Sequence, residues 1–297
     1  MTYIVIKMIY AKLHGRIGNH LFEMAAAATL AAQNNDQFCA VCHQDYKIAP
    51  PDNCYVWDFV QPYLDNIYRN VTILESIPNN LVTFKQDGFK YVSIPYQQNL
   101  LLDGGFQSYK FFNEEVVKKL FSIPKQIKED ILWHYGEIFS KPIISVNVRR
   151  GDYCYIPHKL PVCSKDYFKK AMKMFPANSR FVFISDDLAW CKKHFRGRNV
   201  YFLENSNPLF DLYAQTLCTD NIISNSTFSW WGAYLNPHPT KKVIYPQPWF
   251  GKYAQNSKSD VEDLIPPTWI PLKNRLSFPM WLKAKKLGLL TCLHQIQ

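Results

Sequence analysis

The feature that most restricts the possible folds is a regular alternation of apolar and helical segments between Pro142 and Tyr245. The apolar segments are short and rich in β-branched residues, as in the buried strands of a parallel sheet. Strands that alternate with helices are typical of βαβ units. The strands are expected at 143–148, 180–184, 200–203, 221–223 and 242–245, and the helices at 164–174, 187–195, 208–217 and 228–234.

The N-terminal part shows a similar opening of strand, glycine turn and helix, expected at 2–10, 15–19 and 21–32. Prolines predict irregular structure over 39–80 and 246–271. Two further helices are expected, one that begins after a cap at Asn113 and one over 126–139. The sequence therefore predicts an α/β fold with an N-terminal half, a C-terminal half and a Pro-rich, basic tail. The limits are 1–140, 141–250 and 251–297.

The composition excludes a disordered chain, because 47 % of the residues are apolar and 20 % are charged. Lys and Arg exceed Asp and Glu by 34 to 24. This excess favours an anionic partner such as nucleic acid, an acidic membrane or a phosphorylated substrate, unless it serves solubility alone. No run approaches the roughly 20 apolar residues that span a bilayer.

We expect a cytoplasmic protein with reduced cysteines, because the sequence shows no signal peptide. Cys39–His43 spells the haem attachment pattern Cys-x-x-Cys-His. Covalent haem attachment normally requires export, and there is no second Cys-x-x-Cys pair for zinc. No cofactor is therefore expected.

The turn Gly15–Asn19 combines two glycines, which let the backbone approach a ligand closely, with the cation Arg16. Asn19 is expected to cap the helix that follows, whose N-terminus favours an anion. A plain strand-to-helix turn is the alternative interpretation.

Two arginines, Arg149 and Arg150, leave the end of a predicted buried strand, with Asp152 just beyond. Arginine binds phosphate oxygens through two parallel hydrogen bonds, and Asp152 can orient one guanidinium or act as a base. A second strand ends before Asn225, Ser226 and Thr227, whose polar side chains and the helix amides after them suit phosphate. A structural ion pair and simple helix capping are the alternatives.

Two further motifs carry carboxylates. Asp103 and Gln107 can bind a sugar, with an irregular strand end as the alternative interpretation. Asp186 and Asp187 follow the strand predicted at 180–184 and can hold a ribose, a base edge or a metal. Asp187 can equally cap the next helix. The chain has no Asp-x-Asp pair to hold a divalent ion against a diphosphate, so arginines and helix amides are expected to stabilise that group.

Five blocks occur in an order that resembles the bacterial α-1,2-fucosyltransferases of glycosyltransferase family 11, over about residues 10–250. The blocks are Gly15–Asn19, Asp103–Gln107, Val148–Tyr153, Ser185–Asp187 and Asn225–Gly232.

The resemblance implies a GT-B-like pair of Rossmann-like domains with a cleft between them, GDP-fucose as donor, inversion at the fucose carbon and no metal. It also assigns Arg149 and Arg150 to the donor site. Asn147 stands where the family has histidine, so no charged role is expected there.

On this interpretation the enzyme moves fucose from GDP-fucose to the 2-hydroxyl of a galactose on a glycan. Arg149 is expected to stabilise the leaving diphosphate, and Asp152 is the candidate base. The other donor-binding candidates are Asn147, Arg150, Asp187, Asn225, Ser226, Thr227, Gly15, Arg16, Gly18 and Asn19. Asp103 and Gln107 are the acceptor-binding candidates, with the acceptor lying near Arg16 and Asn19.

Two alternatives stay open: a transferase for another GDP- or UDP-linked sugar, and a nucleotide- or nucleic-acid-binding module suggested by the positive charge. We expect no nucleic acid partner, because no RNA-binding signature occurs. The tail 273–290 places Lys and Arg beside Trp281, Phe278 and several leucines. It is expected either to lie in a membrane interface, on the inner face and near lipid-linked glycans, or to pack on the protein as a helix.

Overall fold

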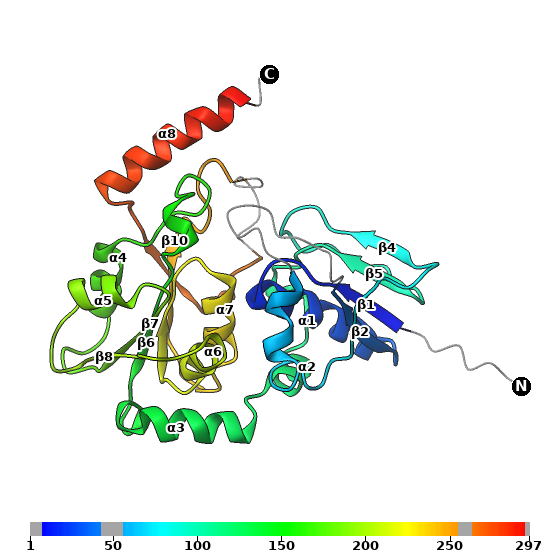
Figure 1. The fold of residues 1–297 in the computed structure, drawn as a ribbon, viewed down its shortest axis with the longest axis horizontal. Helices are drawn as coiled ribbons and strands as arrows, with labels where there is room; N and C mark the ends of the chain where they lie inside the picture. Colours follow the sequence, from blue (N-terminus) through cyan, green and yellow to red (C-terminus); the bar gives the residue numbers. More distant parts are fainter. Residues whose placement is uncertain (1–7, 43–55, 255–262, 295–297) are drawn as a thin grey trace, which may run out of the picture. The chain divides into compact units, whose positions relative to one another are not determined.

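The computed structural model describes residues 8–42, 56–254 and 263–294. The chain forms two compact units (Figure 1). Unit 1 comprises Met1–Pro124 and Ser259–Pro266, and unit 2 comprises Lys125–Lys258 and Pro267–Gln297.

Unit 1 contains a parallel sheet in the strand order β3-β2-β1-β5-β4. Its central strand begins the chain's described part, and the next strands add on both sides, as in Rossmann-like sheets. The strands are β1 (Met8–Lys12), β2 (Gln37–Val41), β3 (Ile73–Leu74), β4 (Val82–Lys85) and β5 (Leu100–Asp103). The helices are α1 (Ile17–Gln33) and α2 (Glu114–Phe121), with short 3₁₀ turns at Val56–Phe59, Gln61–Tyr63 and Tyr109–Phe111.

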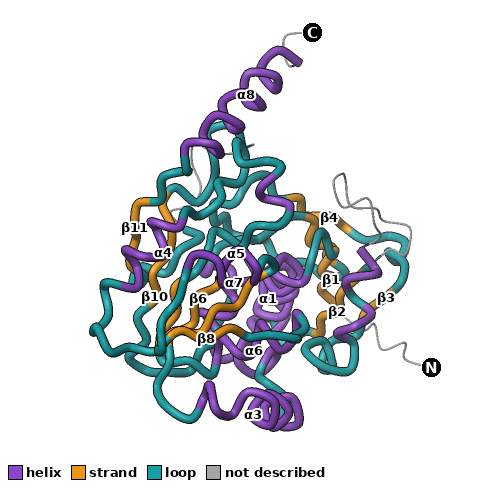
Figure 2. Tube along the Cα trace, turned by 60° about the vertical axis from the view of Figure 1, so that its left-hand side comes forward, coloured by secondary structure: helices purple, strands orange, loops and turns teal. Residues whose placement is uncertain are grey.

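Unit 2 contains a second parallel sheet, in the order β11-β10-β9-β6-β7-β8. Figure 2 shows its strands with helices on either side. The strands are β6 (Ile144–Val148), β7 (Phe181–Ser185), β8 (Val200–Phe202), β9 (Asp220–Ile222), β10 (Val243–Gln247) and β11 (Ile270–Lys273). The helices are α3 (Lys125–Phe139), α4 (Lys165–Met172), α5 (Leu188–His194), α6 (Pro208–Thr216), α7 (Thr227–Tyr234) and α8 (Phe278–His294), with a 3₁₀ turn at Asp152–Cys154.

The sheet of unit 2 is buried on both faces, because alternate residues of a strand point to opposite sides. In β7, Phe181 and Phe183 pack in a cluster with residues of α4 and α5, such as Phe168. Val182 and Ile184 pack in a second cluster with Ala214 of α6. Strands covered on both faces have continuous apolar sequences, which is why the alternation of segments predicts them well.

The predicted α/β fold of two Rossmann-like halves is confirmed, and the strands and helices from β6 to β10 lie where the sequence placed them. Trp230 and Trp231 are fully buried in α7, as a core position requires. Asn113 caps α2 as predicted, since its side-chain oxygen accepts hydrogen bonds from the backbone N–H groups of Glu115 and Val116.

Three expectations need correction. The segment 39–80 was expected to be irregular but contains strand β3 and part of strand β2, and β1 ends at Lys12 rather than at residue 10. The proline-rich segment 246–271 runs into β11, where Pro271 is tolerated because β11 is an edge strand. Residues 2–7 of the strand expected at 2–10 lie outside the described residues.

Candidate functional site

Three neighbouring strands of unit 2 end at the same edge of the sheet. The order β9-β6-β7 and the parallel pairing bring together the residues that follow each strand. Arg149 follows β6, Asp186 follows β7 and Ser224 lies just after β9. In open α/β sheets ligands bind at the carboxyl ends of the strands. This edge is therefore the first candidate site.

The Arg149 guanidinium lies between two carboxylates. Its Nη2 is 2.5 Å from Oδ1 of Asp152, on the same loop, and its Nη1 is 2.8 Å from Oδ2 of Asp186, on the next strand end. The guanidinium also lies over the Tyr153 ring, 5.4 Å from its centre. Burial alone would lower the pKa of Arg149, but Asp186 and Asp152 outweigh burial and hold the pKa above its usual range. The Arg149 guanidinium is thus held in one position and stays protonated.

Arg150 is held differently. Its Nε donates to Oδ2 of Asp187 at 2.9 Å, and its guanidinium lies 4.2 Å from the ring centre of Trp190. Asp187 also caps α5 by accepting from the Trp190 N–H. Among the described residues no partner is found for the two terminal nitrogens of Arg150. Guanidinium N–H groups arranged as such a fork bind anions through two parallel hydrogen bonds.

A glycine is required between these arginines and Asp152. A Cβ atom on Gly151 would lie 2.6 Å from Oδ2 of Asp186, closer than carbon and oxygen can approach. The same Asp186 accepts a hydrogen bond from the backbone N–H of Arg150 at 2.9 Å. The loop can pass so close to the carboxylate only because residue 151 has no side chain.

The loop after β9 supplies polar groups next to the arginines. The Ser224 hydroxyl accepts from the Arg149 N–H and donates to the Asn147 carbonyl, so it ties β9 to β6. Ser226 stands at the N-cap position of α7 without a side-chain cap bond, and Thr227 begins the helix. The first-turn amides of α7 have no partner within the helix, as at every helix start. These groups suit the phosphate site predicted from sequence.

Three of the predicted donor-binding side chains are buried: Asn147, Asn225 and Ser226. Asn225 is buried, and its amide donates to the Trp249 carbonyl while its oxygen lies 3.6 Å from the Cys163 sulfur. Asn147 is buried within β6. The Asn225 side chain therefore fixes the loop that carries Ser226 and Thr227.

A second group of predicted residues lies in unit 1, around the turn after β1. Gly15 has φ +72°, and a Cβ there would lie 2.6 Å from Nδ2 of Asn19. The expectation that Asn19 caps the helix is wrong, because α1 already begins at Ile17 with Arg16 at the N-cap position. Gly18 is buried in the first turn of α1. The Asn19 oxygen instead accepts from the Gln107 amide at 3.4 Å, which joins two of the predicted residues.

A chain of titratable side chains lies beside this turn. Asp103, at the end of β5, lies 2.8 Å from the Lys12 ammonium and 3.2 Å from Nε2 of His14. The other ring nitrogen of His14 is 3.4 Å from Oε1 of Glu23, in α1. The Asp103 side chain is 23 % exposed and the Glu23 side chain is 2 % exposed. The chain thus runs from solvent into the core of unit 1.

These neighbours change the titration of the buried members. Burial raises the pKa of the Glu23 carboxyl to about 7, against the lowering effect of its hydrogen bond with His14. Burial alone would lower the pKa of His14, but Glu23 and Asp103 outweigh it and raise the pKa. His20 behaves oppositely: complete burial lowers its pKa to about 3. Its Nε2 therefore donates to the Gly15 carbonyl as part of a neutral ring.

Sequence reasoning missed several members of both groups. Asp186 was considered, but its pairing with Arg149 joins two loops 37 residues apart and depends on the strand order. Trp190 was not singled out. In unit 1, His14 and Glu23 lie nine residues apart across a glycine turn, and no sequence pattern signals their contact, because it depends on how α1 packs beside the end of β1.

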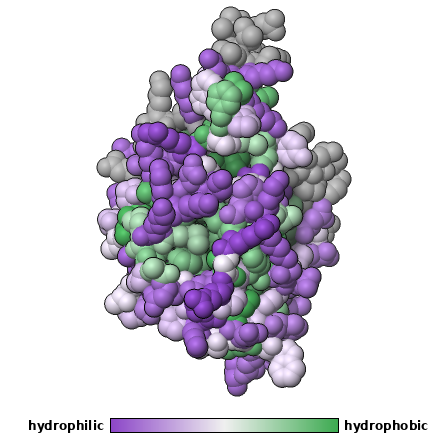
Figure 3. Space-filling view, turned by 90° about the vertical axis from the view of Figure 1, so that its left-hand side faces the viewer, coloured by the Kyte–Doolittle hydropathy of each residue, from purple (hydrophilic) through white to green (hydrophobic). Residues whose placement is uncertain are grey.

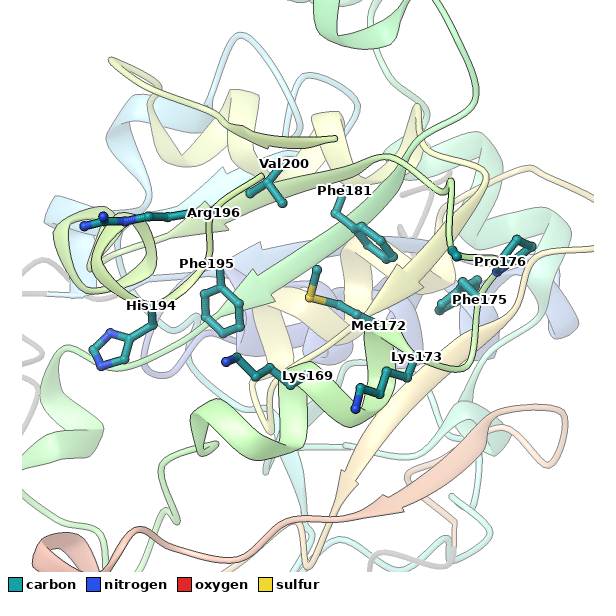
Figure 4. A pocket seen from close by; sticks show the side chains of 11 residues that line it. Lys169, Met172, Lys173, Phe175, Pro176, Phe181, His194, Phe195, Arg196 and Val200 are labelled. Atoms are coloured by element: carbon teal, nitrogen blue, oxygen red, sulfur yellow. The ribbon is translucent and has the colours of Figure 1, made fainter. Parts of the chain in front are cut away.

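Unit 2 also has a cavity of about 430 Å³ at the edge where β7 and β8 begin, opposite the edge with the arginines (Figure 4). Met172 and Phe195 lie side by side in it, and Lys169 and Lys173 lie next to them. None of the predicted site residues lines it. Cys39 and Cys42 are buried free thiols in unit 1, and His43 lies outside the described residues.

Comparisons with known proteins bear on the family and, separately, on the fold. The profile described as Glycosyl transferase family 11 matches residues 4–273. The chain is 34 % identical over 165 residues to the O-antigen biosynthesis glycosyltransferase WbnK of Escherichia coli, covering 50 % of this chain and 53 % of WbnK, about half its length. It is 24 % identical over 294 residues to an Escherichia coli alpha-1,2-colitosyltransferase, covering 90 % and 100 %.

A mammalian relative and a solved structure complete the comparison. Galactoside alpha-(1,2)-fucosyltransferase 2 of Oryctolagus cuniculus is 24 % identical over 238 residues, covering 74 % of this chain and 65 % of that protein. The crystal structure of the fucosyltransferase NodZ from Bradyrhizobium superposes with a TM-score of 0.50 at 14 % identity, covering 78 % and 94 %. At this identity NodZ supports the fold alone.

The raised pKa of Glu23 predicts a pH-dependent stability. Its folded value of about 7 lies above the ordinary 4.5, so the Glu23 carboxyl contributes stability that is full below about pH 4.5 and is lost as the pH rises through about 7. His14, whose pKa is also raised, acts in the same direction. In Glu23→Gln, the fall in unfolding free energy over this range is expected to be smaller by up to about 3 kcal/mol. Urea unfolding at several pH values measures it.

The matched control is Glu115→Gln, at an exposed position of α2. It is expected to keep the wild-type pH dependence. A Glu23→Gln variant whose stability falls with pH as steeply as that of the wild type would contradict the prediction.

Proposed function

Because the chain belongs to glycosyl transferase family 11, we propose that it transfers fucose from GDP-fucose to the 2-hydroxyl of a galactose on a glycan, with inversion at the fucose carbon. The single observation that carries this is the arginine pair at the end of β6, with Arg149 fixed between Asp152 and Asp186. The galactoside fucosyltransferase among the relatives supports the sugar and the linkage.

We propose that the donor diphosphate binds at the strand ends of unit 2. The terminal nitrogens of Arg150 donate to phosphate oxygens, and Ser226, Thr227 and the first amides of α7 bind the same group. As the bond between the fucose carbon and the diphosphate breaks, negative charge grows on the leaving oxygen. Donors already fixed in place stabilise that charge without reorganising. Arg149 does so because Asp152 and Asp186 hold it in one geometry.

The acceptor is proposed to bind unit 1 at Asp103, Gln107 and Asn19. When the acceptor oxygen bonds to the fucose carbon, its proton must leave, and Asp103 is the exposed end of the chain of titratable groups. The proton passes from Asp103 to His14 and then to Glu23, whose raised pKa suits it to accept a proton near neutral pH. Asp152, the base candidate from sequence, is ion-paired with Arg149, as Asp103 is with Lys12. We assign the proton to Asp103 because Asp103 also lies 3.2 Å from His14, which can pass the proton on, and we assign Asp152 to orienting Arg149.

The glycan acceptor is proposed to be a surface glycan carried on a lipid, built at the inner face of the membrane. WbnK is named for O-antigen biosynthesis, which supports this class of acceptor. A second candidate donor follows from the colitosyltransferase, which matches 90 % of this chain. In that case the donor carries colitose or another GDP- or UDP-linked sugar in place of fucose, and the same arginines bind its diphosphate.

The first test is a donor panel. Purified protein is incubated with lactose and GDP-fucose, GDP-colitose or UDP-galactose, with and without EDTA. We expect 2′-fucosyllactose from GDP-fucose and no loss of activity with EDTA, because Arg149 and Arg150 supply the positive charge and their carboxylate partners are engaged. Product from another donor alone, or rescue by Mn²⁺ after EDTA, would overturn the proposal.

The second test is Arg149→Lys. The ammonium keeps the charge but cannot bridge Asp152 and Asp186 with two nitrogens of one planar group. We expect kcat for fucosyl transfer to fall by about 10² to 10³. The control is Arg180→Lys. Arg180 lies just before β7 and donates to the backbone carbonyls of Glu137 and Lys141. Equal losses in both variants would remove the special role of Arg149.

The third test is Asp103→Asn, which keeps the shape but cannot accept the proton. We expect kcat for transfer to fall by about 10² to 10⁴, with KM for GDP-fucose unchanged. The control is Asp65→Asn, at an exposed position of unit 1. Near-normal kcat in Asp103→Asn, or a loss that appears only as a higher KM for GDP-fucose, would refute the proton route.

A further inference from the structure

The two units carry opposite net charge. Unit 1 has 10 Lys and Arg against 14 Asp and Glu, whereas unit 2 has 24 against 10. The whole basic excess of the protein therefore belongs to unit 2. A field of one sign on one part of a molecule attracts a partner of the opposite sign to that part.

Part of this charge lines a cavity of about 520 Å³ in unit 2. The cavity lies between the start of α4 and the segment that joins β11 to α8. Lys165, Lys170, Lys273 and Arg275 line it, and Asp166 is the one carboxylate in its lining. Within the described residues none of the four cations forms an ion pair, unlike Arg149 and Arg150.

An apolar row stands next to the cavity. Phe278 lines the cavity and is 70 % exposed, and Trp281 and Leu282, on the same side of α8, are each 47 % exposed. The Phe278 and Trp281 rings stack with centres 6.0 Å apart, and the Lys285 ammonium lies 5.3 Å from the Trp281 ring centre. Single exposed apolar residues are ordinary, but adjacent ones that form a patch indicate a contact surface.

The other side of α8 is docked on unit 2. Ala284 is buried, and a Cβ on Gly288 would lie 2.2 Å from the Tyr253 ring, so the two groups are in close contact. The Lys283 ammonium lies 5.1 Å from the ring centre of Tyr155. This docking directs the row Phe278, Trp281 and Leu282 outward. Figures 1 and 2 show α8 projecting from unit 2, and Figure 3 shows apolar side chains among hydrophilic ones on this part of the surface.

We propose that this surface binds the headgroups of an anionic phospholipid membrane. The cation-lined cavity takes a lipid phosphate, and the row on α8 enters the boundary between headgroups and acyl chains. The proposal rests on the placement of the acceptor on a lipid, and it assigns the contact to defined residues. Each helix in the described ranges is too short or too polar to cross a bilayer, so α8 lies on the membrane surface in this arrangement.

The charge and the apolar row together favour a lipid over other anionic partners. A nucleic acid requires cations along a groove, with aromatic rings on which bases stack. Here an aliphatic side chain, Leu282, belongs to the exposed row with Phe278 and Trp281. Trp, Phe and Leu on one side of a helix, with Lys beside them, are typical of segments that lie in the membrane interface.

The test is co-sedimentation of the full chain with vesicles of phosphatidylglycerol and phosphatidylcholine, against vesicles of phosphatidylcholine alone. The variant Lys170→Gln/Lys273→Gln/Arg275→Gln is expected to bind the anionic vesicles about a hundredfold more weakly, at roughly fivefold per charge. The matched control, Lys125→Gln/Lys128→Gln/Lys141→Gln, removes three exposed charges at or beside α3 and is expected to bind within about fivefold of the wild type. Trp281→Ala is expected to weaken binding as well.

Two readouts separate this proposal from the proposed function. Transfer to free lactose is expected to be unchanged in both triple variants, because none of these lysines or arginines touches the arginine site. Three results would each overturn the membrane proposal. The first is equal vesicle binding by the two triple variants, and the second is equal binding to anionic and neutral vesicles. The third is that single-stranded DNA competes for the surface while vesicle binding by Trp281→Ala stays at the wild-type level. None of these results bears on the donor assay.

Discussion

A guanidinium that leaves water needs carboxylates around it, and this requirement organises the edge of the sheet in unit 2. Arg149 draws one carboxylate from its own loop, Asp152, and one from the end of the next strand, Asp186. The cluster holds one positive and two negative charges, so removing Arg149 would leave two partly buried carboxylates without their cation, which is costly. The contact with Asp186 depends on the pairing of β6 with β7 in register and on the missing side chain at Gly151. Strand order, register and loop sequence thus act together to place one cation between its partners.

The same compensation determines what the site can do. Arg149 and Arg150 face Asp152, Asp186 and Asp187, so this edge is not a strongly positive pocket that would hold any anion. In the proposed donor site, selectivity for a diphosphate therefore comes from geometry: a planar fork at Arg150, hydroxyls at Ser226 and Thr227, and amides at the start of α7. Arginine suits this arrangement because Arg150 holds a carboxylate through Nε and leaves its two terminal nitrogens for the proposed ligand.

The sequence predicts unit 2 well and unit 1 less well for a physical reason. Strands β6 and β7 are covered on both faces, so their sequences are continuously apolar and easy to detect. Strand β11 is the exception in unit 2, because its edge position tolerates Pro271 and the proline hides the strand. In unit 1, α1 starts earlier than expected because Gly15 supplies the turn with positive φ. In the candidate site, the local pair Arg149 and Asp152 is within reach of sequence reasoning. Sequence reasoning does not reach contacts that depend on strand order or on a helix packing against a strand end. Examples are the contact of Arg149 with Asp186 and that of His14 with Glu23.

Cations in unit 2 serve two different physical purposes, which their partners distinguish. At the strand ends, carboxylates neutralise the arginines, so their field fades within a few ångströms and only their geometry matters. At the cavity beside α4, Lys170, Lys273 and Arg275 have no ion-pair partner among the described residues, so their field extends into solvent by about a Debye length, about 8 Å at physiological ionic strength. A compensated site suits catalysis, where a charge must be held still, and an uncompensated one suits capture of a large charged surface. On the membrane proposal, the cations that line the cavity serve the second purpose, and Arg149 and Arg150 serve the first.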